Sequence, residues 1–411
     1  MWRWGISSGL IFLALASETY AIEPELWAED IRQYEMSLKE LHIDLFNAIS
    51  EEQFTSALNE LVSTLSEKSD SEVILELMAL TRRIDDGHTA IRANSNIRFP
   101  LELYYINRAW KVVGVHEDHA DMLGSSLVSI GGHPVNEVAE AIRPFLQNVE
   151  NAYSEEIRLS ESMVNAELLL ALDLISEEGS ATFGYSNQNG ETNVTLNASQ
   201  NGEGDDFVRY DTSEPVVRRV SELGTDLLWF GLLGDKDAVY IRFAGYPTFE
   251  EMEAFGEKLL AYIDSNGSSK LVIDFRGNGG GDFFVGLTLA YYLNLADSID
   301  WKSGVFLLTD KYTFSAAVSN STQFRQILNA KIVGEPTGGN PVGYQDMGTF
   351  KLRNSGLTVT YSKRMFRFQQ QATEGIQPDV LVEYDWNAYV NGVDNILKFV
   401  VDTISQMESG D

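Results

Sequence analysis

The second half of the sequence alternates between short apolar strands and helices, and this pattern constrains the fold more than any other feature. The expected strands are Ala238–Phe243, Leu271–Phe275, Val305–Leu308 and Lys331–Val333, and the expected helices are Phe249–Ile263, Phe284–Leu293, Ser315–Leu328 and one near Val393–Ile404, with a hairpin region around Phe350–Tyr361. Alternation of this kind is typical of α/β proteins. It predicts an α/β core with a largely parallel sheet.

The residues before this core fall into two further groups. Residues 22–95 carry helical patterns: an apolar stripe runs from Trp27 to Leu45 at steps of three and four, and Ser50 to Gln53 form a capping-box pattern that opens a second helix. Residues 96–150 hold short strand-like runs and a Gly-Gly turn, which predict a small β-rich module. We assign the remaining residues, 151–411, to the α/β core, with turns or a loop expected over 187–206.

The amino terminus is typical of an export signal. Residues 1–21 begin with a short segment that carries Arg3, continue with an apolar stretch too short to span a bilayer, and end with small residues at possible cleavage sites. A buried first helix is the alternative. No later segment resembles a membrane span. We therefore expect a protein exported to the bacterial periplasm or exterior, without stable insertion in a membrane.

Charge and cysteine content exclude several function classes. The chain of 411 residues has 30 Lys and Arg against 61 Asp and Glu, a net charge of −31, which would repel a nucleic-acid backbone. It contains no cysteine, so disulfides, thiolate metal sites and a cysteine nucleophile are all excluded. His116 and His119 lack further placed ligands, and we predict neither a metal site nor a cofactor.

A glycine-rich turn follows the strand at 271–275. In Arg276-Gly-Asn-Gly-Gly-Gly281, backbone N–H groups can converge without interference from Cβ atoms, at the start of a helix. A phosphate loop would end in Lys-Ser or Lys-Thr, whereas this one continues to Asp282, which repels anions. The turn is therefore either an oxyanion hole for acyl transfer or a tight turn without a ligand.

Ser315 follows the next strand and stands at the expected bend into a helix, with two alanines behind it. This resembles a nucleophile elbow, in which the hydroxyl is exposed and the following N–H can face an oxyanion. An ordinary helix N-cap is the alternative. A serine nucleophile needs a base, and of the five histidines only His88 lies in a polar Asp-Asp-Gly-His-Thr loop at a helix end, where glycine gives freedom to aim the imidazole.

Five blocks in register resemble those of the S41 peptidases, which include the tail-specific or carboxy-terminal processing proteases and the tricorn core protease. The blocks are Asp86-Gly-His-Thr89, Asp274-Phe-Arg-Gly-Asn-Gly-Gly-Gly281, Thr313-Phe-Ser-Ala-Ala317, Gly334-Glu-Pro-Thr-Gly-Gly339 and Gly375-Ile-Gln-Pro-Asp-Val380. The resemblance spans roughly residues 75–400. It implies a crotonase/ClpP-like α/β protease core, an amino-terminal helical domain and a PDZ-like module, either intact or degenerate.

The resemblance also implies roles for individual residues. Ser315 matches the family nucleophile, and the N–H groups of Ala316 and of Gly280 or Gly281 match its oxyanion donors. The processing proteases place a general-base lysine where this chain has Asn340. Because asparagine cannot accept the serine proton, this position argues against a Ser-Lys dyad.

The tricorn-like branch instead uses a histidine, which His88 matches. An acid shortly before Pro-Asp orients that histidine; Glu374 fits this role, and Glu335 is the alternative. The branch also has a serine just before the histidine, where this chain has Gly87.

Basic residues gather in the stretch 347–373, which contains no acidic residue. Arg364 and Arg367 are the candidates for binding a substrate carboxylate, as in peptide-tail recognition, and the polar face of a hairpin is the alternative. Together these features predict an exported serine endopeptidase of the S41 type acting on peptides or unfolded proteins. A non-catalytic protein that binds apolar ligands or peptides on the same scaffold, and a hydrolase of other esters or amides, are the alternatives.

Overall fold

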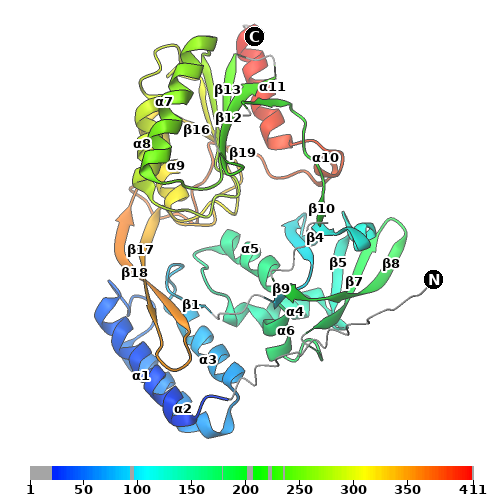
Figure 1. The fold of residues 1–411 in the computed structure, drawn as a ribbon, viewed down its shortest axis with the longest axis vertical. Coiled ribbons are helices and arrows are strands. Elements are labelled where there is room, and N and C mark those ends of the chain that lie inside the picture. The colour runs from blue at the N-terminus through cyan, green and yellow to red at the C-terminus, as the bar shows by residue number, and fades with distance from the viewer. Residues whose placement is uncertain are drawn as a thin grey trace, which may run out of the picture.

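The structure is a computed structural model, and it describes residues 21–92, 97–177, 179–200, 207–220, 225–234 and 237–409. The expected export signal at 1–21 therefore lies almost wholly outside the described residues. Three units are visible in Figure 1: the α/β core at the top, a helical unit at the lower left and a β-rich unit at the lower right.

The core is built on a seven-stranded sheet in the order β11-β12-β13-β14-β15-β16-β19. These strands are β11 (Val217–Arg219), β12 (Leu228–Leu233), β13 (Ala238–Phe243), β14 (Lys270–Asp274), β15 (Val305–Thr309), β16 (Lys331–Gly334) and β19 (Val380–Leu381). From β13 to β19 all neighbours are parallel, whereas β11, β12 and β13 pair antiparallel. The predicted α/β fold with a largely parallel sheet is confirmed.

Helices cover both faces of this sheet. Residues Ile241, Ile273 and Leu307 face one side, where they pack with buried residues of α7 (Phe249–Asn266), α8 (Phe283–Leu293) and α9 (Ala316–Ile327). Their neighbours Val272 and Phe306 face the other side and pack with α11 (Asn395–Ser409). This alternation follows from the two-residue period of a strand, and it explains why the central strands are apolar throughout.

The helical unit contains α1 (Pro24–Leu41), α2 (Glu51–Thr64) and α3 (Asp70–Arg82), and the capping box at Ser50 and Gln53 is present as predicted. A long hairpin from the core, β17 (Val342–Lys351) and β18 (Thr358–Arg367), reaches down and packs against these helices through Leu352, Leu357 and Val359 (Figure 1). Strand β1 (Ala90–Arg92) pairs with β18. The loop between α3 and β1, which carries His88, is thereby fixed to the core.

The β-rich unit extends beyond the expected boundary at residue 150. The strands of its sheet are β3 (Leu101–Ile106), β4 (Ala109–His116), β5 (Ser126–Ile130), β6 (His133–Pro134), β7 (Ser180–Asn187), β8 (Gly190–Asn197) and β10 (Phe207–Arg209). Its helices are α4 (Val135–Ile142), α5 (Ala152–Ser162) and α6 (Ala166–Ala171). Leu159, Leu169 and Phe183 share one buried cluster with Val112 and Ile130. The segment after residue 150 thus completes this unit before the chain enters the core sheet.

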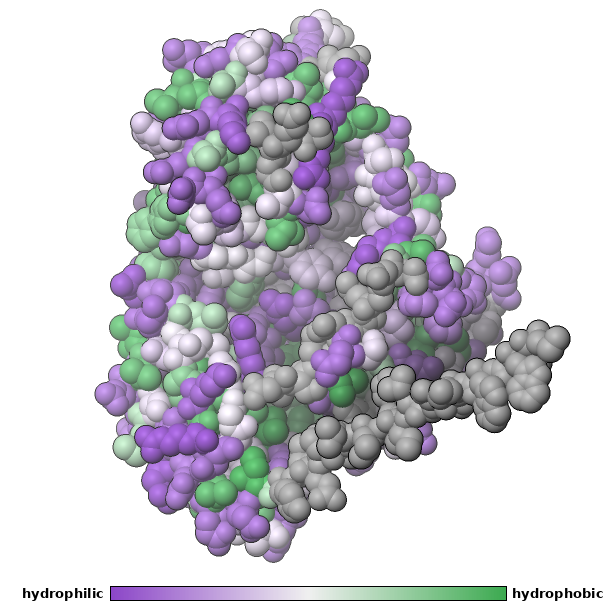
Figure 2. Space-filling model, viewed as in Figure 1, coloured by the Kyte–Doolittle hydropathy of each residue, from purple (hydrophilic) through white to green (hydrophobic). Residues whose placement is uncertain are grey.

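Hydrophilic residues dominate the face of the molecule shown in Figure 2, and hydrophobic residues are scattered over it rather than gathered. This agrees with a net charge of −31. Among the described residues, no helix combines the length and the apolar character needed to cross a bilayer.

Candidate active site

Ser315 stands at the sharp bend between β15 and α9, with φ of 51° and ψ of −124°. A positive φ is uncommon for a residue with a side chain, and it is held here by the neighbouring turn: Phe314 N–H donates to Asn278 O at 3.0 Å, and Thr313 Oγ1 donates to Phe275 O at 3.2 Å. The Ser315 side chain makes no capping hydrogen bond to the helix. The geometry is therefore that of a nucleophile elbow and not of an N-cap.

His88 lies beside this serine although 227 positions separate them in the chain. Its Nε2 is 2.9 Å from Ser315 Oγ, and the side chain is buried, with 4% of the residue exposed. The ring also stacks on Phe314, with 5.4 Å between centroids. The two groups that the sequence analysis singled out thus come within hydrogen-bond distance of each other.

The loop that carries His88 is tied together by one buried carboxylate. Asp86 accepts the backbone N–H of His88 at 2.9 Å and the hydroxyl of Thr89 at 2.6 Å, and its Oδ2 lies 3.0 Å from Nε2 of His42. His42, which ends α1, is therefore a partner of this loop. Because Asp86 binds backbone and side chains together, the loop presents the imidazole in one orientation.

The acid beside His88 is Glu150, from the loop that precedes α5. Glu150 Oε1 lies 3.1 Å from His88 Nδ1, and among the described residues neither atom has a well-directed hydrogen bond. The other oxygen of this carboxylate accepts the Asn340 N–H at 2.6 Å. Burial lowers the pKa of His88, but contact with Glu150 and the charge of Asp86 outweigh it, so the pKa lies above the ordinary histidine value.

The expectation that Glu374 orients His88 is wrong for this structure. Glu374 is exposed and has no contact with the imidazole. The backbone beside it is pinned elsewhere: Gly375 N–H donates to Asn340 Oδ1 at 2.8 Å, and Ile376 N–H donates to Thr337 Oγ1 at 2.7 Å. The alternative, Glu335, is buried at another place, where it accepts the Tyr104 hydroxyl at 2.8 Å and where burial raises its pKa to about 7.

Gly87 and Asn340, the two departures from the family pattern, both contact Glu150. A Cβ atom on Gly87 would lie 2.3 Å from Glu150 Cγ, so the glycine leaves the room that this side chain occupies. Asn340 donates its backbone N–H to the Glu150 carboxylate and its Nδ2 to the Glu150 carbonyl at 3.0 Å. Asn340 therefore positions the Glu150 carboxylate and does not itself act as a base.

The glycine turn 276–281 passes directly over Ser315. A Cβ on Gly280, whose φ is 106°, would lie 2.6 Å from Ser315 Cβ, so only glycine allows this approach. The Gly280 N–H, one of the expected oxyanion donors, is already engaged with Asn278 Oδ1 at 2.9 Å. Within the described part of the chain, the N–H groups of Gly281 and Ala316 have no acceptor and remain free to bind an oxyanion.

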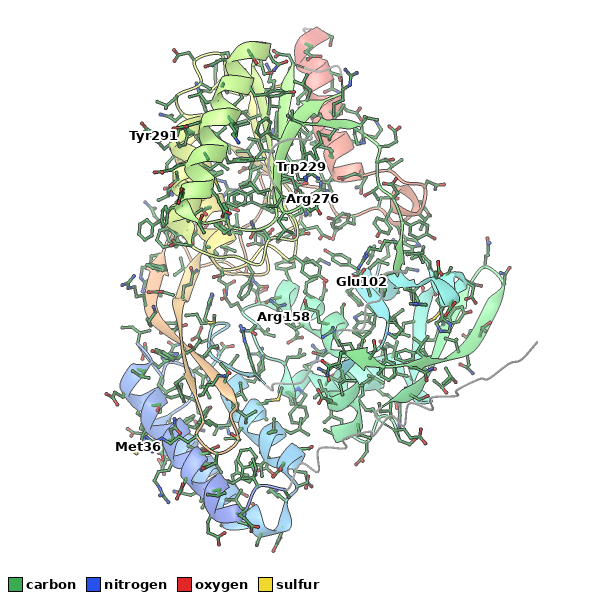
Figure 3. The ribbon with its side chains drawn as sticks, in the orientation of Figure 1. Met36, Glu102, Arg158, Trp229, Arg276 and Tyr291 are labelled. Atoms are coloured by element: carbon green, nitrogen blue, oxygen red, sulfur yellow. The ribbon has the colours of Figure 1, made fainter. Side chains whose placement is uncertain are left out.

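Ser315 and His88 open into a cavity of about 830 Å³. Its walls include four cations and two carboxylates, which are Arg92, Arg158, Lys363, Arg364, Asp282 and Asp346, and the rings of Phe283, Phe284, Phe314 and Phe366. Arg158, labelled in Figure 3, reaches from α5 over the Phe314 ring. Arg364 lines this cavity, with an ion pair of 3.1 Å to Asp346, whereas Arg367 is exposed outside it.

A comparison with known proteins adds to this geometry. Residues 290–382 match the model of peptidase family S41. The structure of mature CPAF complexed with lactacystin is similar to this chain, with 14% identity, a TM-score of 0.69 and coverage of 94% of this chain and 99% of that one. Another structure of mature CPAF has 13% identity, a TM-score of 0.66 and coverage of 94% and 98%. No curated protein sequence matches the chain.

The match over residues 290–382 supports the S41 family and, with it, a peptidase function. The likeness to CPAF shows a shared α/β protease fold over nearly the whole length of both chains. The described residues contain no group of three or more His, Asp or Glu side chains that could hold a metal ion.

Proposed function

We propose that this protein is an exported serine peptidase of the S41 type in which Ser315 is the nucleophile, His88 the general base and Glu150 the acid that orients the base. One observation carries the proposal: the 2.9 Å contact between His88 Nε2 and Ser315 Oγ at a strand-to-helix elbow. An N-cap serine would have no need of a buried imidazole, and a binding protein would need neither group in this arrangement.

The chemistry follows from the positions of the groups. His88 Nε2 takes the hydroxyl proton as Ser315 Oγ bonds to the peptide carbonyl carbon, and the carbonyl oxygen becomes an oxyanion between the N–H groups of Ala316 and Gly281. Each such donor supplies about 2.7–4 kcal/mol of barrier lowering. Glu150 stabilises the imidazolium, which then protonates the departing amine as the C–N bond breaks. Water, deprotonated by the same imidazole, releases the acyl group and restores Ser315.

The cavity around Ser315 suits an extended peptide with an anionic group. Its cations outnumber its carboxylates, in a chain whose net charge is −31, and phenylalanine rings offer an apolar surface for side chains. We propose that Arg364 binds the substrate carboxylate because it lines this cavity. Arg367 does not line the cavity, and we assign it no role in substrate binding. We also propose export to a bacterial periplasm or exterior, on the composition of residues 1–21 alone.

A fluorophosphonate probe tests the proposal, because it reacts only with an activated serine. We expect the wild-type protein to be labelled and to cleave an unfolded protein, and we expect Ser315→Ala and His88→Ala to lose both properties, roughly 10⁶-fold in kcat, because the groups act as a unit. The matched control is Ser321→Ala in the same helix, whose hydroxyl donates to Ala317 O. Activity that survives in Ser315→Ala would refute the proposal, and uptake of a fluorescent apolar ligand without labelling would favour a binding protein.

A further inference from the structure

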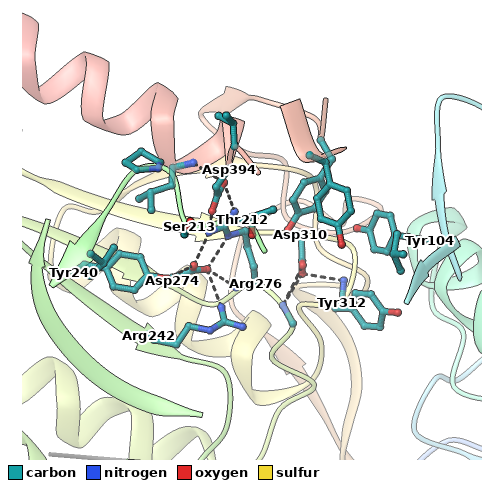
Figure 4. A pocket seen from close by; sticks show the side chains of 18 of the residues that line it. Tyr104, Thr212, Ser213, Tyr240, Arg242, Asp274, Arg276, Asp310, Tyr312 and Asp394 are labelled. Atoms are coloured by element: carbon teal, nitrogen blue, oxygen red, sulfur yellow. Dashed lines mark hydrogen bonds and ion pairs between the residues drawn. The ribbon is translucent and has the colours of Figure 1, made fainter. Parts of the chain in front are cut away.

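A second cavity, of about 610 Å³, lies where the core meets the β-rich unit. Arg242 and Asp274 stand at the carboxyl ends of β13 and β14, and Asp310 follows β15, so the cavity opens at the edge of a parallel sheet where ligands of α/β proteins commonly bind. Figure 4 shows Tyr104 of β3 approaching from the opposite side. Neither Ser315 nor His88 lines this cavity.

Six aromatic side chains line this cavity. They come from the β-rich unit, the core sheet and the segment before α11, and they are Tyr104, Trp229, Tyr240, Tyr312, Tyr384 and Tyr389. Tyr104 stacks on Tyr312 with 5.7 Å between centroids and meets Tyr384 edge to face at 5.6 Å. A cavity of this size in which flat aromatic faces stand beside charged groups is suited to a small molecule with a planar body and a polar end.

The charged groups of the cavity differ in the hydrogen-bond partners that they have within the protein. Arg276 is held by Asp274 and Asp394, each through two short hydrogen bonds of 2.6–2.9 Å (Figure 4). Asp310 accepts the N–H groups of Gly277, Tyr312 and Thr313 at 3.0–3.1 Å. These groups have their partners within the protein.

Arg242 differs from them. It has one ion pair, with 3.3 Å from Nη1 to Asp274 Oδ1, and its guanidinium makes no hydrogen bond to any described residue. A quarter of its side chain, 25%, is exposed, although it lines a cavity rather than the outer surface. A guanidinium is the group best matched to a carboxylate, since it can donate two parallel hydrogen bonds. Besides its ion pair with Asp274, Arg242 therefore keeps N–H donors at the cavity wall that no described residue accepts.

We propose that this cavity binds an aromatic monocarboxylate, with the carboxylate on Arg242 and the ring among the tyrosines. A second negative charge on the ligand is disfavoured because Asp310 and Asp394 line the same space. The ligand is either a free aromatic acid or the carboxyl-terminal aromatic residue of a peptide, since both present the same groups. The proposal does not depend on hydrolysis at Ser315.

Calorimetric titration of the full chain tests this site with two probes. Indole-3-propionate represents the free acid and acetyl-Gly-Gly-Trp the chain end, and each is compared with its own amide on the Ser315→Ala protein, so that no probe is cleaved. We expect the acid of at least one pair to bind and its amide to bind roughly tenfold or more weakly, as for the loss of a charge-assisted hydrogen bond. Binding of the first probe alone assigns the site to small acids, and binding of the second assigns it to chain ends.

Three variants complete the experiment. Arg242→Gln is expected to lose the preference for acid over amide, Val113→Trp to lose binding because the indole fills the cavity, and Arg353→Gln, an exposed arginine elsewhere, to bind like the parent. Equal binding of acid and amide, or full binding by Val113→Trp, would overturn the proposal. Because binding is measured without hydrolysis, failure here is distinct from failure of the peptidase assignment.

Discussion

The sheet of the core and the group of residues around Ser315 are assembled in different ways. The parallel strands β13 to β16 come from one continuous stretch of chain, and their apolar residues pack on helices that lie between them in sequence. Ser315 and its glycine turn belong to this stretch, whereas His88 comes from the helical unit and Glu150 from the β-rich unit. The core alone therefore positions the nucleophile, whereas activation of the nucleophile requires that all three units be in contact.

This difference predicts two classes of variant. Changes at the contacts among the three units should reduce activity and leave the unfolding free energy nearly unchanged, because they touch few buried apolar groups. Changes within the core should reduce stability first.

Among residues that contact neither Ser315 nor the substrate, Glu150 should give the largest loss of activity. Glu150→Gln keeps the size of the side chain but removes the charge that orients His88 and stabilises the imidazolium, and we expect kcat to fall on the order of 10⁴-fold, as in the matching change of other triads. Because Glu150 holds the pKa of His88 up, the acid limb of the pH–rate profile should also move to lower pH in the residual activity. The control is Glu374→Gln, expected to act like the wild type; the reverse pattern would show that Glu374 orients the base.

A change inside the core should act on stability instead. Asp274 is fully buried between Arg276, Arg242 and the Tyr240 hydroxyl, and its two arginine partners hold its pKa well below the usual range. Asp274→Asn leaves a buried guanidinium poorly paired, and we expect the unfolding free energy in urea to fall by about 3–5 kcal/mol.

The sign of the pH dependence follows from the same pKa. Since the folded-state pKa of Asp274 is depressed, its contribution is present above the unfolded-state pKa and is lost as pH falls through the folded-state value. The wild type should therefore lose this stability only in strong acid, and the variant should show less of that loss. An unchanged urea midpoint for Asp274→Asn would contradict the prediction that changes within the core reduce stability.

Filling the space at Gly87 should disturb the acid without touching any reacting atom. Gly87→Ala puts a methyl group 2.3 Å from Glu150 Cγ, so the carboxylate must move away from His88. A displacement of about 1 Å in such a group can reduce kcat by about 10²-fold. Gly179→Ala, where a Cβ meets nothing within 4 Å, is the matched control. Wild-type kcat in Gly87→Ala would show that Glu150 has no fixed role.

Arg364 should give the smallest effect. Its side chain is 64% exposed and already paired with Asp346, so its attraction for a substrate carboxylate is screened. For Arg364→Ala we expect kcat/KM to fall roughly two- to fivefold for peptides with a free carboxylate, as for exposed ion pairs, and less for their amides. Arg367→Ala, outside the cavity, serves as the control. Equal losses for free and amidated peptides would favour the alternative, in which Arg364 is only part of the polar face of the hairpin.

Sequence patterns predicted what depends on local periodicity. The strands β13 to β16 and the bend at Ser315 follow from apolar runs, glycines and their spacing, and each lies within a residue or two of its expected bounds. The segment Gly190–Asn197 was expected as a loop because it is polar, yet it forms β8. It pairs along its whole length with β7 and buries only Leu196. Because most of its side chains are polar, the sequence shows only a short alternation of apolar and polar residues, too little to predict a strand.

The acid could not be found in this way. Glu150 stands in no motif, and its position results from packing between the Asn148–Asn151 turn and the loop at Asn340, which are about two hundred residues apart. Gly87 was a usable signal: a small residue beside a candidate base indicates that another side chain fills the space. Such a signal points to a neighbour but does not name it.

The packing of Gly87 against Glu150 makes two solutions mutually exclusive in this loop. A chain of this fold can carry a hydroxyl immediately before the histidine, or it can bring a carboxylate across from the neighbouring unit, but the same volume cannot hold both. Among relatives, a side chain at the first position should therefore accompany loss of the glutamate at the second, and that correlation can be read from sequences alone.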